Sequence, residues 1–111
     1  MQYRRAKIKG GTYFFTVVTH NRRQFLCQPE NVELLRNSFR YVMKRHPFKI
    51  DAFVLLLDHL HCIWTLPPGD ADFSTRWNLI KGHFSRAVAK GERVSESRVK
   101  RRERGLWQRR F

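Results

Sequence analysis

The chain has few cysteines, few acidic residues and no long apolar run. Its two cysteines, Cys27 and Cys62, form no CxxC pair and are too few for the disulfide framework of a small secreted domain. The basic N-terminus lacks the apolar core of a signal peptide, and no apolar run reaches membrane-spanning length. We therefore expect no membrane partner and a location in the reducing cytoplasm.

The scarcity of acidic residues leaves a large excess of positive charge. Only 9 of the 111 residues are Asp or Glu, against 23 Lys and Arg, so the formal net charge is +14. Of the basic residues, 12 lie in residues 76–111, which hold only 3 acidic ones. An excess of this size and clustering favours a nucleic-acid partner over a merely well-solvated surface, because neutralised phosphates release counterions.

A chain of 111 residues with 41% hydrophobic content is long enough for one domain with a single core. Its apolar periodicity predicts strands at 12–19, 48–57, 59–66 and 105–111, and helices at 30–45 and 73–89. Residues 12–19 are so uniformly β-branched or aromatic that both faces of that strand are expected to be covered. Residues 92–104 are basic without periodicity, which predicts a mobile loop.

This order of elements predicts an α+β fold of the ferredoxin-like, split βαβ type. Four antiparallel strands would form one sheet, with two helices on one face. Each predicted helix has a single apolar stripe, so the other face of the sheet would be left for a ligand.

The segment from Asp58 to Cys62 interrupts two apolar runs at the start of the expected third strand. Side chains two residues apart share a face of a strand, so His59 and His61 point one way and Leu60 and Cys62 the other. Two neutral imidazoles on a rigid strand supply half of a divalent-metal site, although two polar residues at the mouth of a hairpin fit the pattern as well. Zinc is disfavoured because no cysteine shares the histidine face. If the strand starts at Asp58, that side chain points to the opposite face and would serve the turn.

Basic residues near both ends and along the second helix are candidates for contacts to DNA phosphates. The outer face of helix 73–89 is expected to carry three of them, although a solvated helix face would show the same pattern. The candidates are Arg4, Arg5, Arg76, Lys81, Arg86, Arg109 and Arg110. Trp77 could stack on a base, but it lies on the apolar stripe and is expected in the core.

Several short motifs occur along the chain in a fixed order. They are Tyr3-Arg4-Arg5, Gly11 to Thr19, His46-Pro47-Phe48, Asp58 to Pro67, Asp72-Phe73-Ser74, Arg76-Trp77 and Trp107 to Phe111. Together these motifs resemble those of the REP-associated tyrosine transposases, which belong to the HUH endonuclease superfamily. The resemblance covers residues 3–111.

The resemblance implies a function for the histidine pair. His59 and His61 would be the two histidines of the HUH motif and would hold Mg²⁺ or Mn²⁺ at the scissile phosphate of single-stranded DNA. The DNA would be a hairpin from a repeated extragenic palindrome. A tyrosine hydroxylate would attack the phosphorus and leave a 5′-phosphotyrosine and a free 3′-hydroxyl.

The resemblance also places the attacking tyrosine on a helix beyond Trp107 to Phe111, where this chain stops. Tyr3, Tyr13 and Tyr41 do not occupy that position. We therefore expect residues 1–111 to form a single HUH transposase-like domain that lacks this helix and cannot form the covalent intermediate alone.

Two other functions compete with this one, and a homodimer is left open. The first is a non-enzymatic nucleic-acid-binding module, although no RNP-like string is present to support RNA recognition by the sheet. The second is a nuclease that uses a metal-activated water, which would need carboxylates that the histidine face does not obviously supply.

Overall fold

The computed structural model describes residues 7–91, 106–108 and 111. Its elements are β1 (Thr12–Val18), the 3-10 turn η1 (His20–Arg22), α1 (Pro29–Arg45), β2 (Lys49–Leu55), β3 (His59–Thr65) and α2 (Phe73–Gly91). These confirm the first three predicted strands and both predicted helices, with ends that differ by at most two residues. The predictions for Arg4, Arg5, Arg109, Arg110 and the loop 92–104 lie outside the described residues.

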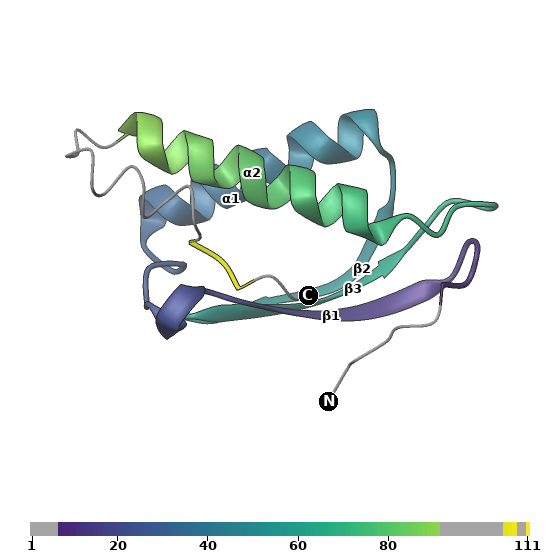
Figure 1. Cartoon of the computed structure of the whole chain (residues 1–111), viewed down its shortest axis with the longest axis horizontal. Coiled ribbons are helices and arrows are strands. Elements are labelled where there is room, and N and C mark those ends of the chain that lie inside the picture. Colours follow the sequence, from purple (N-terminus) through teal and green to yellow (C-terminus); the bar gives the residue numbers. More distant parts are fainter. Residues whose placement is uncertain (1–6, 92–105, 109–110) are drawn as a thin grey trace.

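The strands form an antiparallel sheet in the order β1-β3-β2, and α1 and α2 both pack on one face of it (Figure 1). The chain therefore has the predicted α+β architecture, with both helices on one side. Within the described part of the chain the sheet has three strands. Beside the free edge of β1, Thr19 and Trp107 form an isolated bridge, flanked by two 2.8 Å bonds from His20 N to Leu106 O and from Gln108 N to Val18 O.

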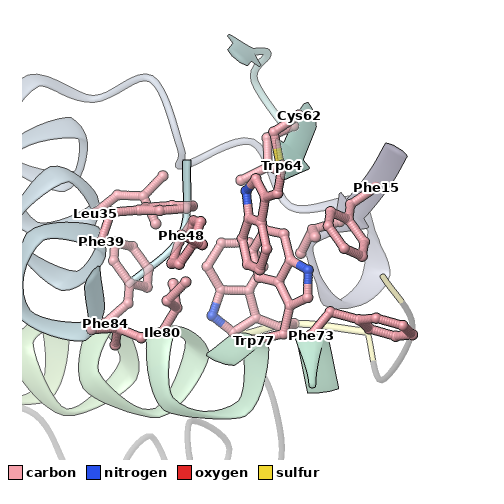
Figure 2. Packing of buried hydrophobic residues seen from close by; sticks show 14 of the residues in the cluster. Phe15, Leu35, Phe39, Phe48, Cys62, Trp64, Phe73, Trp77, Ile80 and Phe84 are labelled. Atoms are coloured by element: carbon pink, nitrogen blue, oxygen red, sulfur yellow. The ribbon is translucent and has the colours of Figure 1, made fainter. Parts of the chain in front are cut away.

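Aromatic side chains fill the space between the helices and the sheet (Figure 2). Trp64 from β3 stacks on Trp77 from α2 at a centroid separation of 4.4 Å, and the Phe15 ring from β1 meets both. Trp77 is therefore a core residue, as its place on the apolar stripe predicts. Burial of large aromatic side chains is the main stabilising contribution here, at roughly 25 cal/mol for each Å² of apolar surface removed from water.

Local signals fix the starts of the helices. Pro29 stands in the first turn of α1, where its missing N–H costs nothing. The Asp72 carboxylate caps α2 by accepting a 3.0 Å hydrogen bond from Thr75 N. No helix among the described residues has the length and apolarity that crossing a bilayer requires.

The expectation that both faces of β1 are covered is wrong. Burial alternates along β1, and Phe14 is 56% exposed while Phe15 is fully buried. The reason is that both helices cover the same side of the sheet. We call the other side the open face; the register places on it Phe14, Thr16 and Val18 of β1, Ala52 and Val54 of β2, and His59, His61 and Ile63 of β3.

Candidate metal and nucleic-acid site

The two histidines lie next to each other on the open face, as strand alternation predicts. Their ring centroids are 4.9 Å apart and their planes meet at 78°. Leu60 and Cys62 are buried on the helix side of the same strand. Burial raises the pKa of the Cys62 thiol to about 12, so near neutral pH it stays protonated and is not a metal ligand.

One carboxylate fixes the orientation of His59. Asp58 Oδ1 lies 2.7 Å from His59 Nδ1, and Arg22 Nε donates a 2.9 Å bond to Asp58 Oδ2. The hydrogen bond with His59, and after it the one from Arg22, lowers the pKa of Asp58. An ionised carboxylate only accepts hydrogen bonds, so Nδ1 of His59 carries a proton, and in the neutral ring Nε2 presents its lone pair.

The strand does not start at Asp58, so the condition under which Asp58 would point to the opposite face is not met. Asp58 precedes β3 and does not follow the strand's alternation, so its side chain turns back to the neighbouring imidazole. Its backbone also shapes the turn, because Asp58 O accepts a 3.0 Å bond from Thr19 N.

A hydroxyl on the neighbouring strand fixes His61 in the same manner. Thr16 stands opposite His61 in the register, and Thr16 Oγ1 lies 2.9 Å from His61 Nδ1. If the hydroxyl accepts the Nδ1 proton, the Nε2 atom of His61 is also left as a ligand. Both imidazoles are thus held at Nδ1 and available at Nε2.

The η1 turn brings Arg22 to this site through unusual backbone geometry. Asn21 and Arg22 have φ angles of 54° and 52°, in the left-handed region that costs a non-glycine residue about 1 kcal/mol. Arg22 N donates to Thr19 O at 3.1 Å, and its side chain reaches Asp58.

Sequence reasoning missed Thr16 and Arg22. Both reach the site because β1 pairs with β3 in a register that sets Thr16 opposite His61 and Val18 opposite His59. Nothing in the residue pattern of either strand states that register. The polar break at 20–24, directly after β1, was the one available signal.

The donor groups that the described residues bring together here are two imidazoles. In the described residues, no group of three or more His, Cys, Asp or Glu side chains is arranged to hold a metal ion. Asp58 is engaged by His59 and Arg22. This donor set suits an ion whose other positions are taken by water and phosphate oxygens.

The outer-face placement of Arg76 is wrong. Arg76 is 4% exposed, and its guanidinium forms two bonds of 3.1 and 2.8 Å to the Asp70 carboxylate. It also donates to the carbonyls of His46, Pro47 and Asp72. This arginine joins the start of α2 to the end of α1 and presents no donor to DNA.

Lys81 is also turned away from the solvent face on which it was expected. Its Nζ donates a 2.8 Å bond to Gln108 O and lies 5.1 Å from the centre of the Phe111 ring. Burial lowers the pKa of Lys81 to about 8. Arg86 is exposed on α2, where the sequence predicted it.

The described tyrosines lie across the sheet from the histidines. Tyr13 is buried on the helix side, and its hydroxyl exchanges two 2.6 Å bonds with the backbone of Ile8. Tyr41 lies on α1 with Arg45 3.7 Å above its ring. Neither phenol faces the imidazole pair.

Comparison with known proteins decides the family of this fold and site. Residues 7–111 match the family described as Transposase IS200 like. The chain belongs to the IS200-like transposases.

Curated members of this transposase group are similar over most of the chain. It is 51% identical over 86 residues to a REP-associated tyrosine transposase of Escherichia coli K12, covering 78% of this chain and 52% of that protein. It is 36% identical over 110 residues to a Haemophilus influenzae protein provisionally named as one of these transposases, covering 98% of this chain and 62% of the relative. The chain thus spans about half to 62% of the length of these relatives.

A solved transposase structure shares this fold. It is a REP-associated tyrosine transposase bound to a REP hairpin, superposes with a TM-score of 0.74 and is 49% identical. The match covers 80% of this chain and 53% of that one. The family resemblance seen in the sequence motifs is therefore confirmed.

Proposed function

We propose that this chain is the part of an IS200-like transposase that holds a divalent metal ion and positions a phosphate of hairpin or single-stranded DNA for cleavage. The observation that carries the proposal is the anchoring of both imidazoles at Nδ1, by Asp58 and by Thr16. This leaves two Nε2 atoms side by side on the open face. Such anchoring fixes the tautomer and ring direction that a metal ligand needs.

The donor set fits Mg²⁺ or Mn²⁺. Two neutral nitrogens leave most positions of a six-coordinate ion for water and phosphate oxygens, and the chain's charge of +14 favours the DNA that brings those phosphates. When bound, the ion would supply Lewis-acid stabilisation of charge on the phosphoryl group.

Further proposals concern the DNA and the sheet. A REP hairpin is the proposed DNA, on the strength of the solved relative bound to one. The candidates for backbone contacts are Arg4, Arg5, Arg86, Arg109 and Arg110. The bridge between Thr19 and Trp107 supports a fourth strand beside β1, which would complete a ferredoxin-like sheet.

We also propose that the full reaction uses a tyrosine other than Tyr13 and Tyr41. In that reaction a phenolate oxygen forms a bond to phosphorus, and the bond to the 3′-oxygen breaks and leaves a 3′-hydroxyl. Both described phenols lie on the helix side of the sheet. The part of the reaction assigned to this chain is therefore phosphate binding and orientation.

Titration with Mn²⁺, followed by NMR of the histidine rings, tests the metal site. Paramagnetic broadening should appear first at His59 and His61. His83 is a matched internal control, because its Nδ1 is likewise held by a hydroxyl, Ser38 Oγ at 2.7 Å, but on the helix side of the sheet. His59→Gln and His61→Gln should each abolish the broadening of the remaining partner.

The same samples distinguish the competing functions. DNA binding that persists without any effect of Mn²⁺ at His59 and His61 would favour a plain nucleic-acid-binding module. Equal broadening at His83 would show non-specific metal binding and would overturn the proposed site.

A further inference from the structure

The open face carries an apolar patch directly beside the histidine pair. Phe14 and Val54 are 56% and 53% exposed. Ile63 stands between Phe14 and Ala52 in the register, one row along the sheet from His61. We call these four residues, Phe14, Ala52, Val54 and Ile63, the apolar floor.

The Phe14 ring is held in a defined orientation within this floor. It stacks on the imidazole of His61 with a centroid separation of 5.6 Å and an interplanar angle of 18°. Thr16 and Val54 stand on either side of His61 in the neighbouring strands. The ring therefore has a fixed relation to the proposed phosphate-binding atoms, unlike a scattered surface hydrophobic residue.

The exposed ring and the positive charge of the protein indicate which kind of ligand the apolar floor would bind. An exposed aromatic ring on a strongly basic protein attracts a partner that is both planar and attached to phosphate. Asp51, the carboxylate next to Ala52 on β2, is engaged by Thr65 at 2.6 Å and by Lys49 at 3.3 Å, which reduces repulsion of a polyanion. A nucleotide bound through its phosphate at the histidines carries its base one sugar away, within reach of a neighbouring ring.

We propose that Phe14 and the apolar floor form a nucleobase-stacking subsite for the base next to the phosphate held at His59 and His61. The inference rests on the proposed function and deepens it, because it assigns a recognition element to the open face. Base stacking on an aromatic side chain tolerates any base and is worth about a 5- to 150-fold change in affinity per base. The subsite would fix the position of the strand, while the choice of sequence would come from other contacts.

A thermodynamic cycle between protein and DNA tests the subsite. Binding of a hairpin oligonucleotide with a single-stranded flank is measured by fluorescence anisotropy at fixed salt and saturating Mg²⁺, so that the ion proposed to hold the phosphate is present. Phe14→Ala should weaken binding about 5- to 150-fold. A series of oligonucleotides is also prepared, each with one abasic position in the flank. One of them should bind the wild-type protein as weakly as Phe14→Ala binds the intact oligonucleotide.

The decisive outcome is the combination of the two changes. With the abasic oligonucleotide that loses affinity, Phe14→Ala should cause no further loss, because both changes remove the same contact. Tyr41→Ala is the matched control, since Tyr41 is an aromatic residue 43% exposed on the helix side. It should leave affinity unchanged on every oligonucleotide.

Two further variants keep the test valid if Phe14→Ala folds poorly. Phe14→Leu preserves apolar contact with Ile63 but offers no π face, and should lose part of the affinity. Phe14→Trp should restore or increase it. If affinity does not depend on the aromatic character of residue 14, the subsite is overturned.

The remaining outcomes separate this proposal from the proposed function. Site-specific Mn²⁺ broadening at His59 and His61, without any coupled abasic position, would overturn the subsite alone. Loss of both signals would overturn the proposed function as well. A Phe14→Ala variant that alters self-association, with equal losses on all oligonucleotides, would assign the floor to contact between copies.

Discussion

At the scale of single residues, Asp58 fixes the tautomer and the orientation of the His59 imidazole. Its two oxygens bind different partners, His59 Nδ1 at 2.7 Å and Arg22 Nε at 2.9 Å, and the second contact fixes the carboxylate in place. An imidazole that donates one proton to a carboxylate is held in a single tautomer and is a more basic ligand at its other nitrogen. Asp58 is thus a positioning residue that acts through His59.

Replacement of Asp58 should therefore weaken metal binding without changing the ligands. We expect Asp58→Ala to raise the Kd for Mn²⁺ about 10- to 100-fold, the usual effect of losing a partner of a metal-binding histidine. Titration calorimetry or the NMR titration measures it. Asp51→Ala removes a carboxylate at the far end of the open face and should leave the Kd unchanged; equal effects of the two variants would contradict the role of Asp58.

At the scale of elements, the sequence predicts the helices well because their buried stripes are local. The four-, three- and four-residue steps that join Phe73, Trp77, Ile80 and Phe84 define the face of α2 that enters the core. Arg76 adjoins that stripe, and its burial depends on partners that are distant in sequence. The periodicity of α2 does not show that Asp70, in the loop after β3, binds the Arg76 guanidinium. Nor does it show that His46 and Pro47, directly after α1, accept hydrogen bonds from it.

The histidine pair shows the same contrast between local pattern and contacts distant in sequence. Alternation along one strand correctly predicts that His59 and His61 share a face. Thr16 and Arg22 reach them only through the pairing of β1 with β3, which is a tertiary property. At the histidine pair, the alternation of one strand thus predicts the shared face, whereas the side chains that reach the pair from other segments are not predicted.

Arg76 should be one of the most destabilising positions in α2. Arg76→Met removes both bonds to Asp70 and leaves the carbonyls of His46 and Pro47 without this donor. We expect a loss of about 3 kcal/mol in the free energy of unfolding. Urea denaturation measures it, with Arg86→Met on the exposed side of α2 as control. Similar midpoints for the two variants would show that Arg76 is not a structural link.

Lys81 should give the protein a dependence of stability on alkaline pH. Burial lowers the pKa of Lys81 to about 8, from an ordinary value of 10.5. Between these values the unfolded chain holds a proton that the folded chain has lost, so the unfolded state binds more protons and stability rises with pH.

Unfolding free energies measured across this window for wild type and Lys81→Met should differ in slope. The variant lacks the titrating group, so the increase in unfolding free energy that Lys81 causes between about pH 8 and about pH 10.5 should be absent from its curve. Lys44→Met removes an exposed lysine on α1 and is the control. Parallel curves for wild type and Lys81→Met would contradict the assignment.

At the scale of the whole molecule, the two sides of the sheet carry different groups of residues. Both helices lie on one side of the sheet (Figure 1). This helix side holds the aromatic core, the Arg76 link and both described tyrosines. The open face holds the histidine pair and the apolar floor. A DNA strand bound to the open face, as proposed, would be separated from Tyr13 and Tyr41 by the full thickness of the sheet.

This separation predicts that neither Tyr13 nor Tyr41 forms a covalent adduct with DNA. The Tyr13 hydroxyl is already bound to the backbone of Ile8, and Tyr41 lies under Arg45 on α1. A labelled hairpin incubated with the chain and Mn²⁺ should migrate as free DNA on a denaturing gel, even where anisotropy shows binding. Tyr13→Phe and Tyr41→Phe should behave as wild type does. An adduct on Tyr13 or Tyr41, located by peptide mass spectrometry, would contradict the proposal that the open face holds the phosphate. The attacking oxygen must approach phosphorus from the face that holds the phosphate.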